Sequence, residues 1–220
     1  MSGAKKRRVA VVTGTRAEYG LLRPVCQKLL ASDELELELV VTGAHLSEKY
    51  GGTVAEIEAD GMPIAARIPI LNHPSTDLGT CLTIGDAVGR FAEQFSASRP
   101  DCVLVLGDRY EIFAAATAAA VLRIPLAHIS GGDVTAGAAD EFFRHSITKM
   151  ASVHFPVSYT HLDVYKRQAL QRGAQCVELR RRGRAARCCL LYTSHRRTTE
   201  NTRESSASIN EASSCLLYAS

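Results

Sequence analysis

Residues 8–20, RVAVVTGTRAEYG, decide the fold. Residues 9–12 are four consecutive apolar residues, three of them valines, which is typical of a parallel strand that is buried on both faces. Gly14 follows directly and indicates a turn, and residues 18–30 then predict a helix. A strand, a glycine turn and a helix in this order form the first unit of a fold in which parallel strands alternate with helices.

The same alternation continues to residue 156. Further strands are predicted at residues 35–42, 64–70, 102–106, 125–129 and 152–156, and further helices at residues 47–59, 80–98, 110–122 and 140–150. The predicted fold class is therefore α/β, a Rossmann-like doubly wound parallel sheet with helices on both faces. Residues 9–12 and 103–106 are expected at its centre. The alternating apolar and acidic residues at 35–42 predict a half-buried or edge-like strand.

Composition and charge argue against several classes of protein. The chain has no apolar run of about 18 residues, the length that a membrane-spanning helix needs. The basic N-terminus is followed by an apolar run too short for a signal peptide, so we expect a cytoplasmic protein with no membrane contact. Residues 1–157 carry 15 Lys and Arg against 18 Asp and Glu, a net charge of −3, and this excludes the basic surface of a nucleic-acid-binding domain.

The cysteines give no sign of a metal or redox site. Cys26, Cys81 and Cys102 stand singly within apolar patterns and are predicted to be reduced core residues. No Cys-x-x-Cys pair occurs, and no other group of residues has the spacing of metal ligands. We therefore expect neither a metal nor a cofactor.

The pattern changes after residue 158. Residues 158–220 carry 11 Lys and Arg against 5 Asp and Glu, and the hexamer CLLYTS at 189–194 is nearly repeated as CLLYAS at 215–220. No repeat architecture explains so short an echo. Together with SYTHLDVYKRQ at 158–168, these hexamers resemble translated sequencing adapter or a frameshift, and an unusual disordered tail is the alternative. We expect one domain at 1–157 and an aberrant, disordered tail at 158–220.

Four polar clusters follow predicted strands, at residues 13–20 (TGTRAEYG), 42–45 (TGAH), 107–111 (GDRYE) and 128–133 (HISGGD). Ligands of open α/β sheets bind at the carboxyl ends of the strands, so these clusters predict one site. The first cluster lacks the G-x-G-x-x-G spacing of dinucleotide-binding loops. Its glycine turn, Arg16 and helix N-terminus suit an anion, although a tight turn with a surface arginine explains them equally well.

Carboxylates and imidazoles gather in the last two clusters and in the helix that follows. Asp108 stands at a strand end, where the cap of the next helix is the simpler explanation. Asp133, Asp140 and Glu141 fall within nine residues of one another, but Asp140 can cap a helix, and Glu141 is spaced four residues from His145 as in a surface pair. The alternative is acid–base chemistry, in which different environments separate the pKa values of such groups.

The amino-acid sequences of these clusters identify a family more specifically than their residue types do. TGTRAEYGLL at 13–22, VTGAHLSEKYG at 41–51, GDRYE at 107–111 and HISGGDVTAGAADEFFRHSITKMASVHF at 128–155 together resemble the hydrolysing UDP-N-acetylglucosamine 2-epimerases of sialic and legionaminic acid synthesis. The resemblance covers residues 8–157. It implies the N-terminal half of a two-domain fold of the glycosyltransferase-B type, with the active site between the domains.

The resemblance also implies a reaction. A base removes the C2 proton of the UDP-sugar while UDP leaves, and water then adds to the resulting glucal with inversion at C2. Asp108 and Asp140 match the catalytic carboxylates of the family, with Asp133 and Glu141 as further catalytic candidates. The predicted substrate-binding residues are Gly14, Arg16, His45, Arg109, His128, Arg144 and His145. Ser130 stands where many relatives have glutamate, which indicates a modified substrate such as a UDP-diacetamido sugar.

The resemblance ends at residue 157, before the C-terminal domain that would form the other half of the cleft. In the family, most of the uridine and diphosphate site belongs to the C-terminal domain, and nothing after residue 158 resembles that domain. We therefore expect little or no turnover from this chain alone, while full-length relatives are expected to form homo-oligomers. Two other readings stay open: a glycosyltransferase of the same architecture, and a non-catalytic module that binds a sugar nucleotide or another anion.

Overall fold

The computed structural model describes residues 5–131 and 140–155. In these residues six parallel strands form one sheet in the order β3-β2-β1-β4-β5-β6. Its strands are β1 (Arg7–Thr13), β2 (Leu35–Thr42), β3 (Ile64–Ile68), β4 (Cys102–Leu106), β5 (Leu126–Ile129) and β6 (Val153–Phe155). The chain runs outward from β1 to β3, returns to place β4 on the other side of β1, and continues outward to β6. The predicted doubly wound parallel sheet is confirmed.

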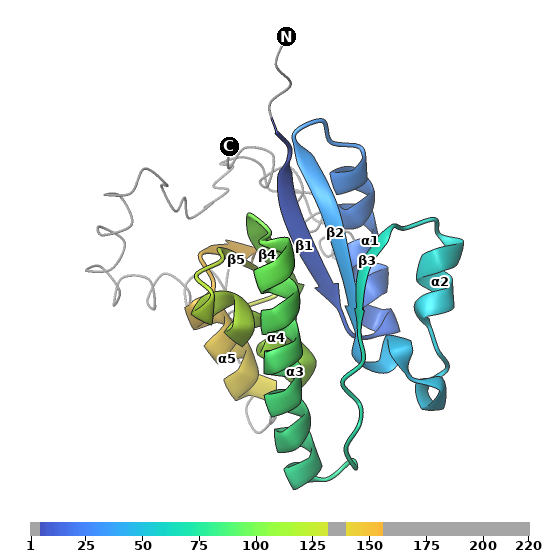
Figure 1. Cartoon of the computed structure of the whole chain (residues 1–220), viewed down its shortest axis with the longest axis vertical. Helices are drawn as coiled ribbons and strands as arrows, with labels where there is room; N and C mark the ends of the chain where they lie inside the picture. The colour runs from blue at the N-terminus through green and yellow to red at the C-terminus, as the bar shows by residue number, and fades with distance from the viewer. Residues whose placement is uncertain (1–4, 132–139, 156–220) are drawn as a thin grey trace, which may run out of the picture.

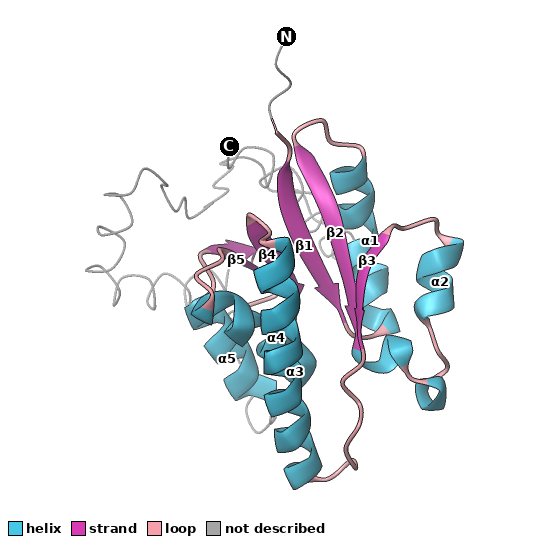
Figure 2. Cartoon of the chain, in the orientation of Figure 1, coloured by secondary structure: helices cyan, strands magenta, loops and turns pink. Residues whose placement is uncertain are grey.

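Helices cover both faces of this sheet (Figure 1). Helices α1 (Arg16–Leu30) and α2 (Val54–Ala59) contribute to the apolar cluster on one face. Helices α3 (Asp77–Ser98), α4 (Tyr110–Val121) and α5 (Asp140–Met150) contribute to the cluster on the other face. Figure 2 shows the sheet between these two groups of helices. Among the described residues, no helix combines the length and the hydrophobicity needed to cross a bilayer.

The central strand explains why both faces must be covered. On β1, Val9 and Val11 belong to the core with α1, whereas Ala10 and Val12 belong to the core with α3 and α4. All four side chains are at most 2% exposed. Strand β1 also pairs with β2 on one side and β4 on the other, so it has no free edge. The uninterrupted apolar run at 9–12 is the sequence signature of this double burial.

Two details differ from the sequence predictions. Strand β2 is not an edge strand, because it lies between β3 and β1; its acidic residues Glu36 and Glu38 reflect solvent access in its first half only. The predicted helix at 47–59 is interrupted, since Gly51 and Gly52 both have positive φ, and α2 begins only at Val54. A short 3-10 turn, η2 (Glu48–Tyr50), occupies the first part of that range.

The cysteine prediction was correct except for the placement of Cys81. All three cysteines are free thiols: Cys26 is buried within α1, and Cys102, partly exposed at the start of β4, packs against the same core, whereas Cys81 is exposed on α3. The tail predicted at 158–220 lies outside the described residues.

We expect the core substitution Phe91→Ala to destabilise the protein by about 3–5 kcal/mol, since the fully buried ring packs 5.7 Å from the ring of Phe95 and its loss leaves a cavity. Urea denaturation followed by circular dichroism measures this loss. Leu78→Ala is the control on the same helix, because Leu78 is 70% exposed and should change the stability by about 0.5 kcal/mol at most. Equal losses in the two variants would contradict this account of the core.

Candidate functional site

The polar clusters that follow β1, β2, β4 and β5 meet at one end of the sheet. The backbone N–H of His45 donates to the carbonyl of Gly14 at 3.3 Å, which joins the loops after β2 and β1. The N–H of Gly107 donates to the carbonyl of Ile129 at 3.0 Å, which joins the loops after β4 and β5. Parallel strands deliver their carboxyl ends to one edge, so residues far apart in sequence become neighbours there.

The loop after β1 satisfies its own backbone donors. Oε2 of Glu18 accepts hydrogen bonds from the N–H groups of Gly14 at 2.8 Å and Thr15 at 3.2 Å. Thr15 in turn caps α1 by accepting from the N–H of Glu18 at 3.4 Å, which completes a capping box. These backbone N–H groups are therefore not available to bind an anion. The positive charge that this loop can offer an anionic ligand comes from Arg16.

Arg16 lies at the surface. Its side chain is 72% exposed, and its Nε donates to Glu56 of α2 at 2.9 Å. An exposed pair of this kind contributes little to stability, so an anionic ligand can displace Glu56 at small cost.

Beneath the first loop lies a cluster of charged side chains that the sequence interpretation missed. Glu18 of α1 and Glu111 of α4 are 6% and 1% exposed, and both face the guanidinium of Arg109. The Nε of Arg109 lies 2.6 Å from Glu111 Oε1 and 3.9 Å from Glu18 Oε1. Both glutamates occupy the first turn of a helix, where an acidic residue is ordinary. Their place within the TGTRAEYG and GDRYE strings was the only signal that could have singled them out.

Burial dominates the electrostatics of this cluster. Burial, helped by the neighbouring charge of Glu111 and opposed by the hydrogen bond from Gly14, raises the pKa of Glu18 to about 7. One guanidinium thus lies between two buried carboxylates of which one is close to protonation at neutral pH.

Two glycines allow the loops to pack this closely. A Cβ atom on Gly14 would lie 2.8 Å from Cγ of Glu111. Gly43 has a φ of 58°, and its Cβ would lie 3.0 Å from the carbonyl oxygen of Gly14. Gly14 is thus required by contacts inside the protein, independently of any ligand.

His45 is buried inside the junction of the first two loops. One ring nitrogen forms a hydrogen bond with Thr13 Oγ1 at 3.1 Å and the other with Thr53 Oγ1 at 2.7 Å. Burial lowers the pKa of the imidazole, so His45 is neutral at pH 7. Its position ties the end of β1 to the start of α2.

Asp108 and Arg144 form an ion pair that joins the loop after β4 to α5. The helix-cap explanation of Asp108 is wrong, because Arg109 holds the cap position of α4 and no side chain caps that helix. The side chain of Asp108 is 22% exposed and that of Arg144 is 11% exposed. Asp140 is exposed at the first residue of α5, four residues before Arg144, so the two lie one helical turn apart on the same side of that helix.

His128 lies behind this ion pair and is fully buried. Its Nε2 lies 2.7 Å from the carbonyl oxygen of Gly107, which can only accept, so Nε2 carries the proton. Its Nδ1 lies 3.2 Å from the hydroxyl of Thr148 on α5. Burial lowers the pKa of His128 to about 4. Both ring nitrogens have protein partners, and this geometry fits a group that holds the β4 loop against α5.

The imidazole of His128 limits the size of the side chain that fits at position 131. A Cβ atom on Gly131 would lie 2.6 Å from Nδ1 of His128, so the first of the two adjacent glycines leaves room for an imidazole of the protein itself. Ser130 has a φ of 62°, a backbone conformation in which only glycine is unstrained. Asp133 lies outside the described residues.

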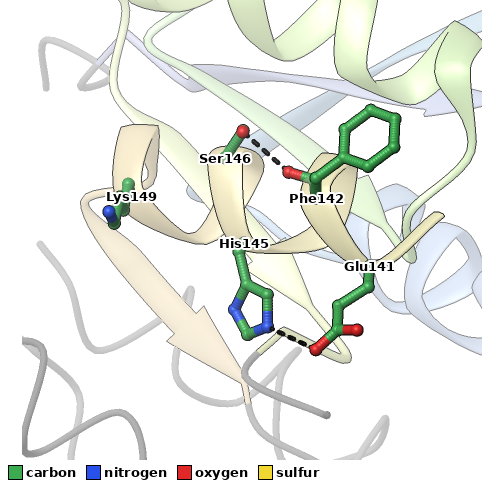
Figure 3. A pocket seen from close by; sticks show the side chains of 5 residues that line it. All are labelled: Glu141, Phe142, His145, Ser146 and Lys149. Atoms are coloured by element: carbon green, nitrogen blue, oxygen red, sulfur yellow. Dashed lines mark hydrogen bonds and ion pairs between the residues drawn. The ribbon is translucent and has the colours of Figure 1, made fainter. Parts of the chain in front are cut away.

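On another part of α5, Glu141 and His145 form the predicted surface pair, with 3.4 Å between Glu141 Oε1 and His145 Nε2. Figure 3 shows the two side chains pointing toward each other. Together with Phe142, Ser146 and Lys149 they line a hollow of about 400 Å³. None of the predicted site residues in the described ranges belongs to a cluster that could bind a metal ion.

Gly14→Ala and Gly20→Ala should change stability in opposite directions. At Gly14 the new methyl group collides with buried Glu111, which we expect to cost about 1–3 kcal/mol. At Gly20, inside α1, nothing lies within 4 Å, so alanine should stabilise the helix by about 0.5–1 kcal/mol. Chemical denaturation of the two variants checks both signs, and a stabilised Gly14→Ala variant would contradict the packing described for this loop.

His128 should remain neutral down to about pH 5, because burial keeps its pKa near 4. Folding then disfavours the protonated ring, so this residue contributes stability above pH 6.5, its unfolded pKa, and that stability is lost as the pH falls toward 4. Nitrogen-15 NMR of the imidazole should show the Nε2–H tautomer from pH 5 to 8. A titration midpoint near 6.5 would contradict this assignment.

Comparison with known proteins extends these observations. The family described as UDP-N-acetylglucosamine 2-epimerase matches residues 27–175. A GDP/UDP-N,N'-diacetylbacillosamine 2-epimerase (hydrolyzing) of Campylobacter jejuni is 40% identical over 170 residues, which are 77% of this chain and 43% of the relative. A UDP-N,N'-diacetylbacillosamine 2-epimerase (hydrolyzing) of Legionella pneumophila is 44% identical over 149 residues, 68% of this chain and 39% of the relative.

The fold comparison agrees with the sequence comparison. A crystal structure of a UDP-N-acetylglucosamine 2-epimerase superposes with a TM-score of 0.66 at 25% identity, over 74% of this chain and 45% of that one. The present chain thus corresponds to the Rossmann-like N-terminal half of a glycosyltransferase-B-type fold, and it spans less than half the length of the curated relatives that it matches. The chain belongs to the UDP-N-acetylglucosamine 2-epimerase family.

Proposed function

We propose that this chain supplies one wall of the active site for hydrolysing 2-epimerisation of UDP-N-acetylglucosamine or a related UDP-diacetamido sugar. The observation that carries the proposal is the Asp108–Arg144 ion pair with Asp140 one helical turn away, at the carboxyl edge of a doubly wound sheet. Two carboxylates and one guanidinium at this edge support the proposal, because folds of this kind bind nucleotides there. A third carboxylate, Asp133, is a further catalytic candidate from the sequence.

The chemistry requires a base and an acid. The C2 proton of the sugar is weakly acidic, so a positioned carboxylate must remove it while the C1–O bond to UDP breaks. Water then adds across the glucal double bond, which releases a product of the N-acetylmannosamine type, and UDP is the other product. Asp108, held by Arg144, and exposed Asp140 are the proposed acid–base pair. Glu141 already pairs with His145, so it is a weaker candidate.

The leaving diphosphate requires cations. Arg16 and Arg109 are exposed at the ends of β1 and β4, and their guanidinium groups can stabilise the negative charge that develops on UDP. His45 and His128 are buried, and both act by holding the loops that carry these residues. No cofactor and no metal is needed for proton transfer and elimination.

The relatives support a diacetamido substrate. Two of them are named as 2-epimerases of UDP-N,N'-diacetylbacillosamine, and Ser130 here stands where a larger acidic residue was expected for the simpler sugar. A small side chain at that position leaves space beside the site for an additional acetamido group.

Activity also depends on the second wall of the cleft. Because the chain covers less than half of its relatives, we propose that the wild-type enzyme acts in the cytoplasm as a longer, homo-oligomeric chain and that the present 220 residues turn over little or no substrate. Without the opposing domain, water reaches the bound sugar and the charges of the site are not preorganised. Neither nucleic acid nor a membrane is a proposed partner.

Asp108→Asn and Asp140→Asn, made in a full-length enzyme that contains residues 1–157, should each lower kcat about 10²–10⁴-fold because proton transfer loses its carboxylate. Release of UDP from UDP-N-acetylglucosamine and from the diacetamido analogue measures this effect. Binding of UDP should change little, which separates an enzyme from an anion-binding module.

Asp33→Asn is the matched control, since Asp33 is exposed in the loop before β2, at the opposite edge of the sheet. Normal turnover by either active-site variant would refute the assigned carboxylates. Normal turnover by the 220-residue chain would refute the need for a second domain.

A further inference from the structure

The buried cluster under the first loop is not used by the acid–base pair described above. Glu18 and Glu111 come from different helices and are both buried, and one oxygen of each, Oε1 of Glu18 and Oε2 of Glu111, has no hydrogen-bond partner in the described part of the chain. A buried carboxylate oxygen without a partner costs free energy, so stability alone does not explain why two such residues are placed together.

The cluster has a definite orientation around Arg109. Glu111 accepts from the Nε of the guanidinium at 2.6 Å, on the side that faces the protein. Glu18 lies 3.9 Å from the same Nε and also accepts from the N–H groups of Gly14 and Thr15. Among the described residues the guanidinium donates from its Nε to Glu111 and its central carbon lies 5.8 Å from the centroid of the Tyr110 ring, while the side chain is 44% exposed. The guanidinium is therefore anchored by one edge and open at the other.

We propose that Glu111 and Glu18 are positioning residues for Arg109: Glu111 fixes the Nε edge of the guanidinium, and Glu18 links it to the Gly14 loop, so that the open Nη edge is presented to the diphosphate of a nucleotide sugar. The anion-binding part of this inference rests on the function proposed above. A planar guanidinium held in this way recognises two phosphate oxygens at once, which a freely rotating arginine does at a greater entropic cost.

The same geometry makes the cluster sensitive to pH. The charged groups that face Glu18 are Glu111 and Arg109, and those that face Glu111 are Arg109 and Glu18, with Tyr110 close by. While Glu18 holds a proton, the cluster has no net charge, because Glu111 and Arg109 compensate each other. When Glu18 ionises, the cluster becomes anionic and repels a diphosphate. Burial sets the pKa of Glu18 to about 7, so anion binding should weaken as the pH rises through that value.

The geometry can be tested on the 220-residue chain itself by nitrogen-15 NMR of the arginine Nε–H groups. The signal of Arg109, identified by its absence in Arg109→Lys, should be shifted and protected from exchange with water. In Glu111→Gln, the exchange rate should rise at least about tenfold, since the charge-assisted hydrogen bond is lost. In Glu111→Asp, which retains the charge, part of the protection should return. Glu93→Gln, at an exposed position of α3, is the control and should change nothing.

The anion-binding part is tested by titrating the same variants with UDP and with inorganic pyrophosphate. Glu111→Gln should weaken binding about tenfold or more. Glu18→Gln should retain binding and lose its pH dependence between about pH 6 and 8, an effect that a purely structural role would not produce.

The two measurements separate the possible failures. An Arg109 signal that is unprotected in the wild-type chain, or unchanged in Glu111→Gln, overturns the positioning role whatever the chain binds. A signal that behaves as expected in a chain that binds neither UDP nor pyrophosphate supports the positioning role and overturns diphosphate binding by Arg109 in this wall alone; the proposed function itself is tested by the carboxylate variants of the full-length enzyme. Unweakened binding by Glu111→Gln overturns the role of the anchored guanidinium in recognising a diphosphate.

Discussion

Strand β1 is buried on both faces and paired on both sides, and this burial governs how the neighbouring strands and helices are arranged around it. A strand that pairs on both sides and packs on both faces must be apolar throughout and must receive helices on each side. Because β2 and β4 flank it in parallel, their carboxyl ends end at the same edge as its own. The loops that follow these strands therefore lie next to one another, and the candidate site forms because the strands are parallel.

At that edge the protein uses its polar groups in two distinct ways. His45, His128 and Glu111 are buried and have partners within the protein, so they fix the loops. Arg16 and Asp140 are exposed and can meet a ligand. Asp108 and Arg144 are intermediate between the two groups, because their mutual ion pair is partly accessible. This division, more than the identity of any residue, fixes the loops through the buried groups and leaves the exposed groups accessible to solvent.

Much of the fold could be predicted because it follows from local patterns. The apolar runs at 9–12 and 103–106 identified the two central strands, and the order of strands and helices identified the doubly wound sheet. The errors fell where neighbours outweigh local pattern: alternation made β2 resemble an edge strand, and a continuous helix was expected across Gly51 and Gly52. The Glu141–His145 pair was predictable because a helical spacing of four residues is itself local.

Local patterns along the chain were enough to predict the fold class, the edge of the sheet at which the candidate site is expected and the residue types available there. Only the tertiary structure decided what those residues do. Asp108 pairs with Arg144, 36 residues away in the sequence, and does not cap helix α4. Glu18 and Glu111 are buried around Arg109. Burial and charge pairing depend on which segments are brought together in space, and no spacing within a single segment contains that information.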